Sequence, residues 1–136
     1  MSPRIAASLT RTVRQRAKER CEYCQLPQDC QEATFHIDHI VPEILGGQGI
    51  VENLALACVS CSLRKAARVQ ARDPQSGMLA QIYHPRMNSW ADHFRWTAGW
   101  KIIGKTPTGR ATIAALRMNR PSIVGIRQLL AAVGRM

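Results

Sequence analysis

Two short cysteine pairs, far apart in the sequence, have the spacing of metal-binding knuckles. They are CEYC at residues 21–24 and CVSC at residues 58–61. Together they supply four thiolates, the donor set of a tetrahedral structural zinc site. A redox pair or unrelated cysteines are the alternatives. We predict that one zinc ion joins the two pairs and stabilises a small core, with Cys30 left as a free thiol. The predicted zinc ligands are Cys21, Cys24, Cys58 and Cys61.

Between the two cysteine pairs, the segment FHIDHIVPE places Asp38 next to His39. An adjacent carboxylate and imidazole can divide the chemistry at a phosphodiester. The carboxylate holds a hard divalent cation, which neutralises charge developing on the phosphate. The imidazole, with an ordinary pKa near 6.5, takes a proton from water. An isolated Asp–His pair is also a common surface ion pair, so this pair alone does not establish catalysis.

The elements expected around these residues are short. A helix is predicted over residues 8–19, with Ser8 as its N-cap. Strands are predicted over 34–41 and 53–57, separated by a glycine-rich loop, and a helix over 59–72 follows. Strict alternation along the first strand would place Asp38 and His39 on opposite faces and would give His36 the face of Asp38.

The second half of the chain carries no catalytic motif. Residues 93–106 predict a small hairpin that turns at positions 98–99, and a helix over 108–119 with a last helix after Pro121 follows it. The segment DPQSG at 73–77 marks a boundary. We therefore expect a core at residues 1–73 and a C-terminal extension at residues 74–136 that packs on the core.

The charge of the chain favours a polyanionic partner. Lysine and arginine number 19 against nine acidic residues, a net charge of +10, and no acid follows Asp92. Such an excess favours nucleic acid, because cations near phosphates release condensed counterions; a solvated basic face is the plain alternative. No apolar run reaches the ~20 residues of a membrane span. The first residues lack the pattern of a signal peptide. A cytoplasmic protein without membrane contact is expected.

The ordered set of motifs resembles the HNH endonuclease family. The matching residues run from CEYC through IDHIVP at 37–42, Gly46-Gly47 and Glu52-Asn53-Leu54 to CVSC and Lys65. The resemblance implies an α+β fold class built on the ββα-metal finger, in which two antiparallel strands and a loop precede a helix. A four-cysteine zinc site would cross-link the segments of this finger and stabilise it. The predicted N-terminal helix and the C-terminal extension with a small hairpin and two helices would flank it.

The resemblance also implies roles for individual residues. His39 corresponds to the general base that activates water, and Asp38 to a ligand of the catalytic divalent ion, commonly Mg²⁺ or Mn²⁺. Asn53 corresponds to the residue that ties down the loop and orients the base. Cleavage in the family leaves 5′-phosphate and 3′-hydroxyl ends.

Ser62 departs from the family pattern. In the family the residue after the last cysteine is usually Asn and sometimes His, and it completes the catalytic metal site from the helix. A serine hydroxyl is a weaker ligand, and Mg²⁺ keeps several waters in its coordination shell. The prediction is a catalytic ion held by Asp38 and Ser62. The metal-side helix, entering the minor groove as the family does, would contact DNA with nearby side chains, namely His36, Arg64, Lys65 and Arg68.

These observations predict a zinc-stapled HNH endonuclease, a hydrolase that nicks or cleaves DNA with one Mg²⁺ or Mn²⁺ ion. A catalytically degenerate zinc module that only binds DNA is one alternative. A nuclease subunit recruited by a larger defence or mobile-element complex is another. A monomer or weak dimer is expected.

Overall fold

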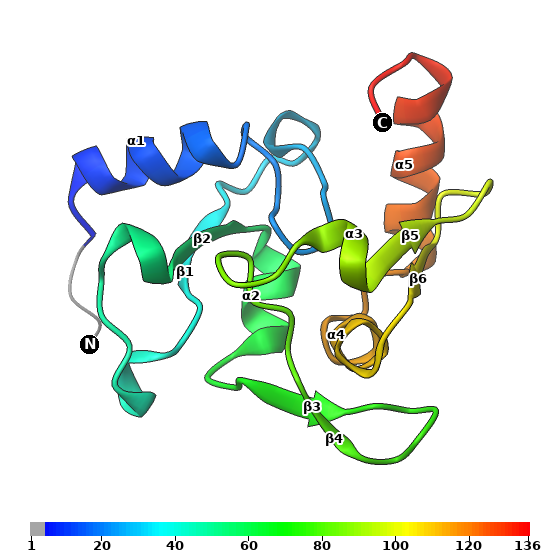
Figure 1. Ribbon diagram of the computed structural model, residues 1–136. Helices are drawn as coiled ribbons and strands as arrows, with labels where there is room; N and C mark the ends of the chain where they lie inside the picture. The colour runs from blue at the N-terminus through cyan, green and yellow to red at the C-terminus, as the bar shows by residue number, and fades with distance from the viewer. Residues whose placement is uncertain (1–4) are drawn as a thin grey trace. The chain divides into compact units, whose positions relative to one another are not determined.

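The chain divides into two compact units in the computed structural model, which describes residues 5–136 (Figure 1). The first unit contains the described residues up to Val69 and the segment His84–Asn88. The second unit contains Gln70–Tyr83 and Ser89–Met136. The division after Val69 lies near the boundary expected at residue 73, but 84–88 returns to the first unit. Across residues 5–136, no helix is both long enough and apolar enough to pass through a membrane.

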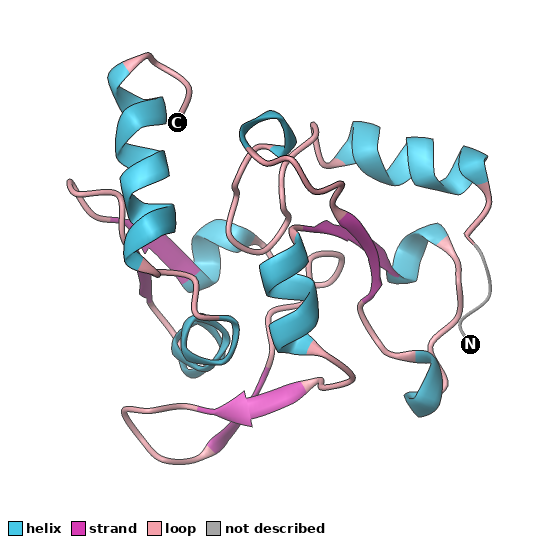
Figure 2. Ribbon diagram, turned by 180° about the vertical axis from the view of Figure 1, so that it is seen from behind, coloured by secondary structure: helices cyan, strands magenta, loops and turns pink. Residues whose placement is uncertain are grey.

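The first unit is built on a two-stranded antiparallel sheet between two helices. Strand β1 (His36–His39) pairs with β2 (Leu54–Ala57) in a register that sets His36 opposite Ala57 and His39 opposite Leu54. Helix α2 (Val59–Lys65) begins two residues after β2. All four residues of β2 are buried, because α1 (Ala7–Arg16) and α2 both pack against this strand (Figure 1, Figure 2). Short 3-10 turns occupy Gln28–Cys30, Glu43–Leu45 and Val51–Asn53.

Helix α1 is fixed by one buried side chain and one arginine. Val13 is fully buried, and Arg16 donates to the carbonyl oxygens of Val51 and Leu54. The helix starts earlier than predicted, because its N-cap is Ala6 without a side-chain bond. Ser8 lies inside the helix, where its carbonyl oxygen accepts a hydrogen bond from the Thr12 hydroxyl at 3.0 Å.

Helix α2 is shorter than the predicted helix over 59–72. It ends at Lys65, because Ala66 adopts a φ of 52° and leaves helical geometry. Gln70–Arg72 then forms strand β3, which pairs antiparallel with β4 (Leu79–Gln81). Residues 66–72 are rich in alanine and arginine, which favour a helix, but pairing with β4 stabilises the extended conformation of Gln70–Arg72 instead. Arg68 follows the helix, and Arg72 belongs to β3.

The second unit packs two small hairpins around a helix. Hairpin β3–β4 and hairpin β5 (Phe94–Trp96)–β6 (Ile102–Gly104) both contact α4 (Pro107–Leu116). The short helix α3 (Trp90–His93) leads into β5, and α5 (Pro121–Ala132) ends the unit. Hairpin β3–β4 was not predicted from the sequence, which indicated one hairpin and two helices for this region.

The loop between β1 and β2 depends on close backbone packing at Gly47. Its amide donates to the Pro42 carbonyl at 3.0 Å. A Cβ atom added to Gly47 would lie 1.7 Å from the carbonyl oxygen of Val41 and 2.8 Å from Nδ2 of Asn53. Neither distance is sterically allowed, so this position accepts only glycine without movement of the backbone.

We expect the Gly47→Ala substitution to destabilise the protein by about 1–3 kcal/mol, the usual cost of forcing extra atoms into a packed site. Denaturant unfolding of the metal-loaded protein measures this loss. Gly125→Ala is the matched control, because a Cβ there meets nothing within 4 Å inside a helix. That control should gain about 0.5–1 kcal/mol. Equal stability of the two variants would contradict the steric constraint at Gly47.

Candidate active site and metal centre

The four cysteines of the two knuckles form one buried cluster. Their sulfur atoms all lie within 4.8 Å of one another, and Sγ of Cys24 is 3.7 Å from Sγ of Cys58. A tetrahedral zinc site with Zn–S bonds of about 2.3 Å has sulfur atoms about 3.8 Å apart. The amides of Cys24 and Cys61 each donate to the first sulfur of their own knuckle, Cys21 and Cys58, at 3.4 Å. The donor set therefore fits a zinc ion.

Burial opposes the joint ionisation of these thiols in the absence of a cation. Burial raises the pKa of the Cys21 thiol, and hydrogen bonds from the neighbouring cysteines raise the pKa of Cys61. Hydrogen bonds from the neighbouring cysteines lower the pKa of Cys58. A bound divalent cation would supply the charge that four adjacent thiolates require.

Glu22, between the two cysteines of the first knuckle, ties that knuckle to β2. Its amide donates to the Leu56 carbonyl at 2.8 Å, and its Oε2 accepts from the Leu56 amide at 2.8 Å. Its Oε1 forms an ion pair with Nη2 of Arg86, which reaches the first unit from the segment His84–Asn88. Burial lowers the pKa of Arg86 to about 10. Sequence analysis missed this pair, since nothing near Arg86 marks it as a partner of the knuckle.

A cleft of about 680 Å³ opens beside β1 and α2 in the first unit. Asp38 and His39 both line it, although alternation along a strand would have separated them. Strand β1 ends at His39, and all four of its residues line the cleft. Strand, loop and helix all contribute to the walls, which are formed by Ile5, His36, Ile37, Asp38, His39, Pro42, Glu43, Ile44, Ser62, Ala66 and Ala67.

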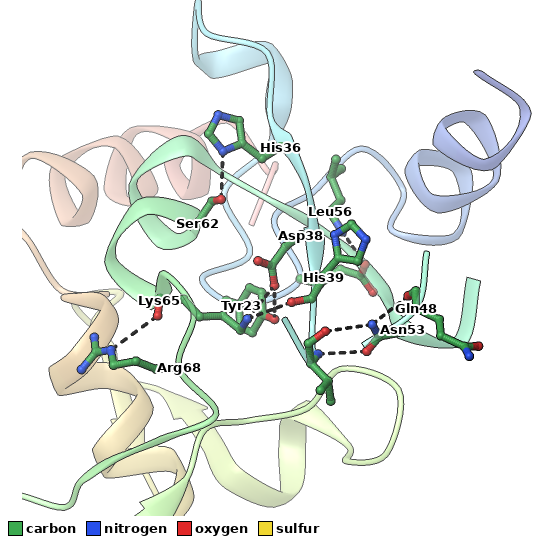
Figure 3. Close-up of polar contacts among 12 residues, drawn as sticks. Tyr23, His36, Asp38, His39, Gln48, Asn53, Leu56, Ser62, Lys65 and Arg68 are labelled. Atoms are coloured by element: carbon green, nitrogen blue, oxygen red, sulfur yellow. Dashed lines mark hydrogen bonds and ion pairs between the residues drawn. The ribbon is translucent and has the colours of Figure 1, made fainter. Parts of the chain in front are cut away.

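The Asp38 carboxylate is held from the interior of the unit. It is 9% exposed, and its Oδ2 accepts from Oη of Tyr23 at 2.9 Å and pairs with Nζ of Lys65 at 3.1 Å (Figure 3). Burial raises the pKa of Asp38, while the charge of Lys65 acts against this shift. Both of these contacts use Oδ2.

Lys65 supports the site from inside rather than from the protein surface. It is 1% exposed, and its Nζ also donates to the His39 carbonyl oxygen at 3.1 Å (Figure 3). The sequence alone groups Lys65 with side chains that contact DNA phosphates. The structure instead places its ammonium between Asp38 and the backbone of His39, because the last turn of α2 faces the strand. Its two contacts therefore link the two predicted catalytic residues.

His39 has a carboxylate neighbour that sequence analysis did not single out. Its Nε2 lies 3.5 Å from Oε1 of Glu43, and the histidine side chain is 15% exposed. Glu43 begins the 3-10 turn after Pro42, four residues beyond His39. The carboxylate lies close enough to orient the imidazole ring of this predicted general base.

Asn53 locks the loop that follows His39. Its Oδ1 accepts from the Val41 amide at 2.9 Å, and its Nδ2 donates to the carbonyl oxygens of Val41 and Gln48 at 3.0 and 2.9 Å (Figure 3). The side chain is buried and satisfies backbone groups on both sides of the loop. Asn53 is thus joined to the loop that follows His39, and it is not among the residues that line the cleft.

The remaining predicted residues lie on or just beyond α2, opposite His36. Oγ of Ser62 is 2.8 Å from Nδ1 of His36, so the hydroxyl predicted to face a metal ion is engaged with this imidazole (Figure 3). Arg64 donates from Nε to the Ser60 hydroxyl at 3.1 Å, and it is half-buried. Arg68 is exposed beyond the helix end and donates to the Arg64 carbonyl oxygen at 2.7 Å.

A comparison with protein-family models identifies this segment. Residues 21–68 match the model described as HNH endonuclease, which covers about a third of the chain. These residues belong to the HNH endonuclease family, as their sequence resemblance indicated. The match includes both cysteine pairs, Asp38, His39 and Asn53. Comparison with curated proteins and with solved structures gave no significant match.

Proposed function

We propose that this protein is a metal-dependent HNH endonuclease that hydrolyses phosphodiester bonds of DNA by nicking or double-strand cleavage. The observation that carries the proposal is that Asp38 and His39 line one cleft within the segment that matches the HNH endonuclease model. Strands β1 and β2 and helix α2 would form the ββα-metal finger of the family. Asn53 would keep the loop after His39 in the geometry that catalysis requires.

Asp38 is the residue best suited to hold a catalytic Mg²⁺ or Mn²⁺ ion. Its carboxylate is a hard oxygen ligand, Asp38 lines the cleft, and its Oδ1 takes no part in the contacts with Tyr23 and Lys65. When bound, the ion would neutralise charge that develops on the phosphate. Lys65 and Tyr23 hold the other oxygen and restrict the rotation of the carboxylate. Ser62, on the opposite wall, is the second proposed ligand, through a hydroxyl or through water.

His39 would serve as the general base. Its imidazole accepts a proton from a water molecule whose oxygen attacks phosphorus, and the bond from phosphorus to the 3′ oxygen breaks. The products are a 5′-phosphate and a 3′-hydroxyl, with the proton on the leaving oxygen taken from solvent. Glu43 would stabilise the imidazolium that forms, because its carboxylate lies beside Nε2. His36, Arg64 and Arg68 would hold the DNA backbone near the cleft.

The four-cysteine cluster would hold a structural Zn²⁺ that has no part in the chemistry. Four protein ligands leave no coordination position for water or substrate, as is usual in structural zinc sites. The cluster joins the segment after α1 to the start of α2, the helix that forms one wall of the cleft. Zinc binding and the geometry of the cleft would therefore be linked through α2.

A DNA-binding module without cleavage is the second candidate function. The observation that favours it is the Ser62–His36 hydrogen bond, since the neutral hydroxyl already has a partner where the family usually supplies a metal ligand. In that case the cleft would bind a phosphate without activating water. Activity measurements separate this candidate from the nuclease.

Supercoiled plasmid incubated with Mg²⁺ or Mn²⁺ should be converted to nicked or linear DNA. His39→Ala should lower the rate about 10²- to 10⁴-fold, because general base catalysis contributes that much. His93→Ala, which changes a histidine of the second unit, is the matched control and should retain activity. Cleavage that persists in His39→Ala would contradict the role of His39. Salt-sensitive DNA binding without cleavage in either metal would support the binding module.

Metal analysis of the purified protein should find about one zinc per chain. Cys58→Ser should lose the zinc and unfold at a lower denaturant concentration, because the remaining thiolates no longer complete the tetrahedral site. Cys30→Ser is the matched control and should keep both the zinc and the stability, since Cys30 lies outside the cluster. A folded parent protein without zinc would refute the assignment of the cluster.

Replacing Ser62 tests the weakest ligand of the proposed catalytic ion. Ser62→Asn should lower the Mn²⁺ concentration that gives half-maximal cleavage several-fold, because an amide oxygen is a better ligand than a neutral hydroxyl. Ser60→Asn, on the same helix but outside the cleft lining, is the control and should leave this concentration unchanged. If Ser62→Asn also leaves it unchanged, Ser62 does not contact the ion.

A further inference from the structure

Positive charge is concentrated on the second unit. Residues 70–83 and 89–136 contain two acids, Asp73 and Asp92. Asp73 is buried and accepts hydrogen bonds from Nε and Nη2 of Arg110 at 3.0 and 2.9 Å, and this arginine holds the pKa of Asp73 below its usual range. Asp92 is therefore the one exposed carboxylate side chain among the exposed cations of this unit, which are Arg72, Arg95, Lys101, Lys105, Arg117 and Arg135.

Three of these cations share one face of the β5–β6 hairpin. Arg95 pairs in register with Ile103. The backbone bonds Thr97 N to Lys101 O, at 2.9 Å, and Lys105 N to His93 O, at 2.8 Å, extend the pairing at both ends. Because side chains alternate between the two faces of a strand, positions 95, 101, 103 and 105 point to the same side. We call this exposed surface the basic ribbon face: Arg95, Lys101 and Lys105 around Ile103.

The opposite face of the hairpin is covered. Phe94 and Ile102 are buried there. The Trp96 ring lies 5.3 Å from that of Trp90 and 5.4 Å from that of Trp100, measured between centroids. The guanidinium of the fully buried Arg127 lies 5.3 Å from the centroid of the Trp96 ring. The basic ribbon face is therefore the side that the hairpin presents to solvent.

The hairpin is held firmly enough to position its charges. The side chain of Asn119 pairs with both backbone groups of Ile102, at 2.8 and 2.7 Å. A Cβ at Gly104 would lie 2.4 Å from the Arg110 amide nitrogen, so β6 and the start of α4 are in backbone contact. Lys105 Nζ donates to the Ala91 carbonyl oxygen at 2.8 Å, which fixes one of the three cations.

We propose that the basic ribbon face is a second DNA-contact surface, which binds phosphates of the duplex on which the first unit acts. The identity of the duplex as substrate rests on the proposed function. Alternate residues of a strand are about 6.8 Å apart, so the three cations form a short row of positive charge. A two-stranded ribbon fits the major groove, and phosphate contacts of this kind hold DNA without reading its sequence. The ribbon adds affinity and orientation to a nuclease whose family segment ends at residue 68.

The test is DNA binding by a protein that lacks the three charges. Fluorescence anisotropy of a short labelled duplex is measured over about 50–200 mM salt in the His39→Ala background, so that the DNA stays intact. Arg95→Gln/Lys101→Gln/Lys105→Gln should bind about ten-fold more weakly at the lower salt. The slope of log affinity against log salt should shrink by about 0.9 for each contact that is lost. Unchanged affinity and slope would overturn the proposal.

A second triple variant provides the matched control. Arg72→Gln/Arg117→Gln/Arg135→Gln removes the same charge from the same unit outside the ribbon. An equal loss of affinity in both triple variants would assign the effect to net charge and overturn the ribbon surface. If the Arg95→Gln/Lys101→Gln/Lys105→Gln variant lost binding to anionic phospholipid vesicles but kept its DNA binding, the ribbon would be a membrane-binding surface. That outcome would also overturn the proposal. If the parent cleaves no DNA but the ribbon variant loses binding, the proposed nuclease function fails and the ribbon assignment stands.

Discussion

Four sulfur atoms brought within 4.8 Å of one another in a buried site are the constraint on which the first unit depends. They come from two segments more than thirty residues apart in the sequence, which the two hydrogen bonds between Glu22 and Leu56 also join. The second pair lies at the start of α2, so the cluster also sets where that helix begins. The position of α2 therefore affects the shape of the cleft, since α2 and the adjacent β1 provide most of its polar lining.

The polar groups behind the cleft form a connected set. Tyr23 belongs to the first cysteine knuckle, yet its hydroxyl bonds Asp38. Lys65, at the end of the helix that the second knuckle starts, contacts both Asp38 and the backbone of His39. The two halves of the cysteine cluster thus each send one side chain to the same carboxylate. A change in the metal-binding cluster would therefore reach the predicted catalytic residues through two separate side chains, without any direct contact between the two sites.

The sequence predicted the grouping of the four cysteines better than it predicted the side chains that support the cleft. Spacing alone identified the four cysteines as one group, and the cluster in the structure agrees with that prediction. The position of Lys65 could not be predicted from spacing. A lysine in a basic segment is expected to contact phosphates, and only the structure shows that this part of α2 faces the strand. Strands β3 and β4 have three residues each, too few for an alternating pattern to outweigh helix propensity. Glu22 and Arg86 are separated by most of the chain's first unit and the β3–β4 hairpin, and only tertiary structure brings them together.

The return of residues 84–88 to the first unit makes the chain cross between the two units three times. A shortened protein that ends between α2 and residue 86 would keep every cysteine of the cluster together with Asp38, His39 and Asn53. It would lose Arg86. The carboxylate of Glu22 would then be left in the first cysteine knuckle without the guanidinium of Arg86, in a site that is mostly buried. The recognisable domain in the sequence therefore ends before a residue that its first cysteine knuckle contacts. A shortened protein that keeps this ion pair has to extend through residues 84–88.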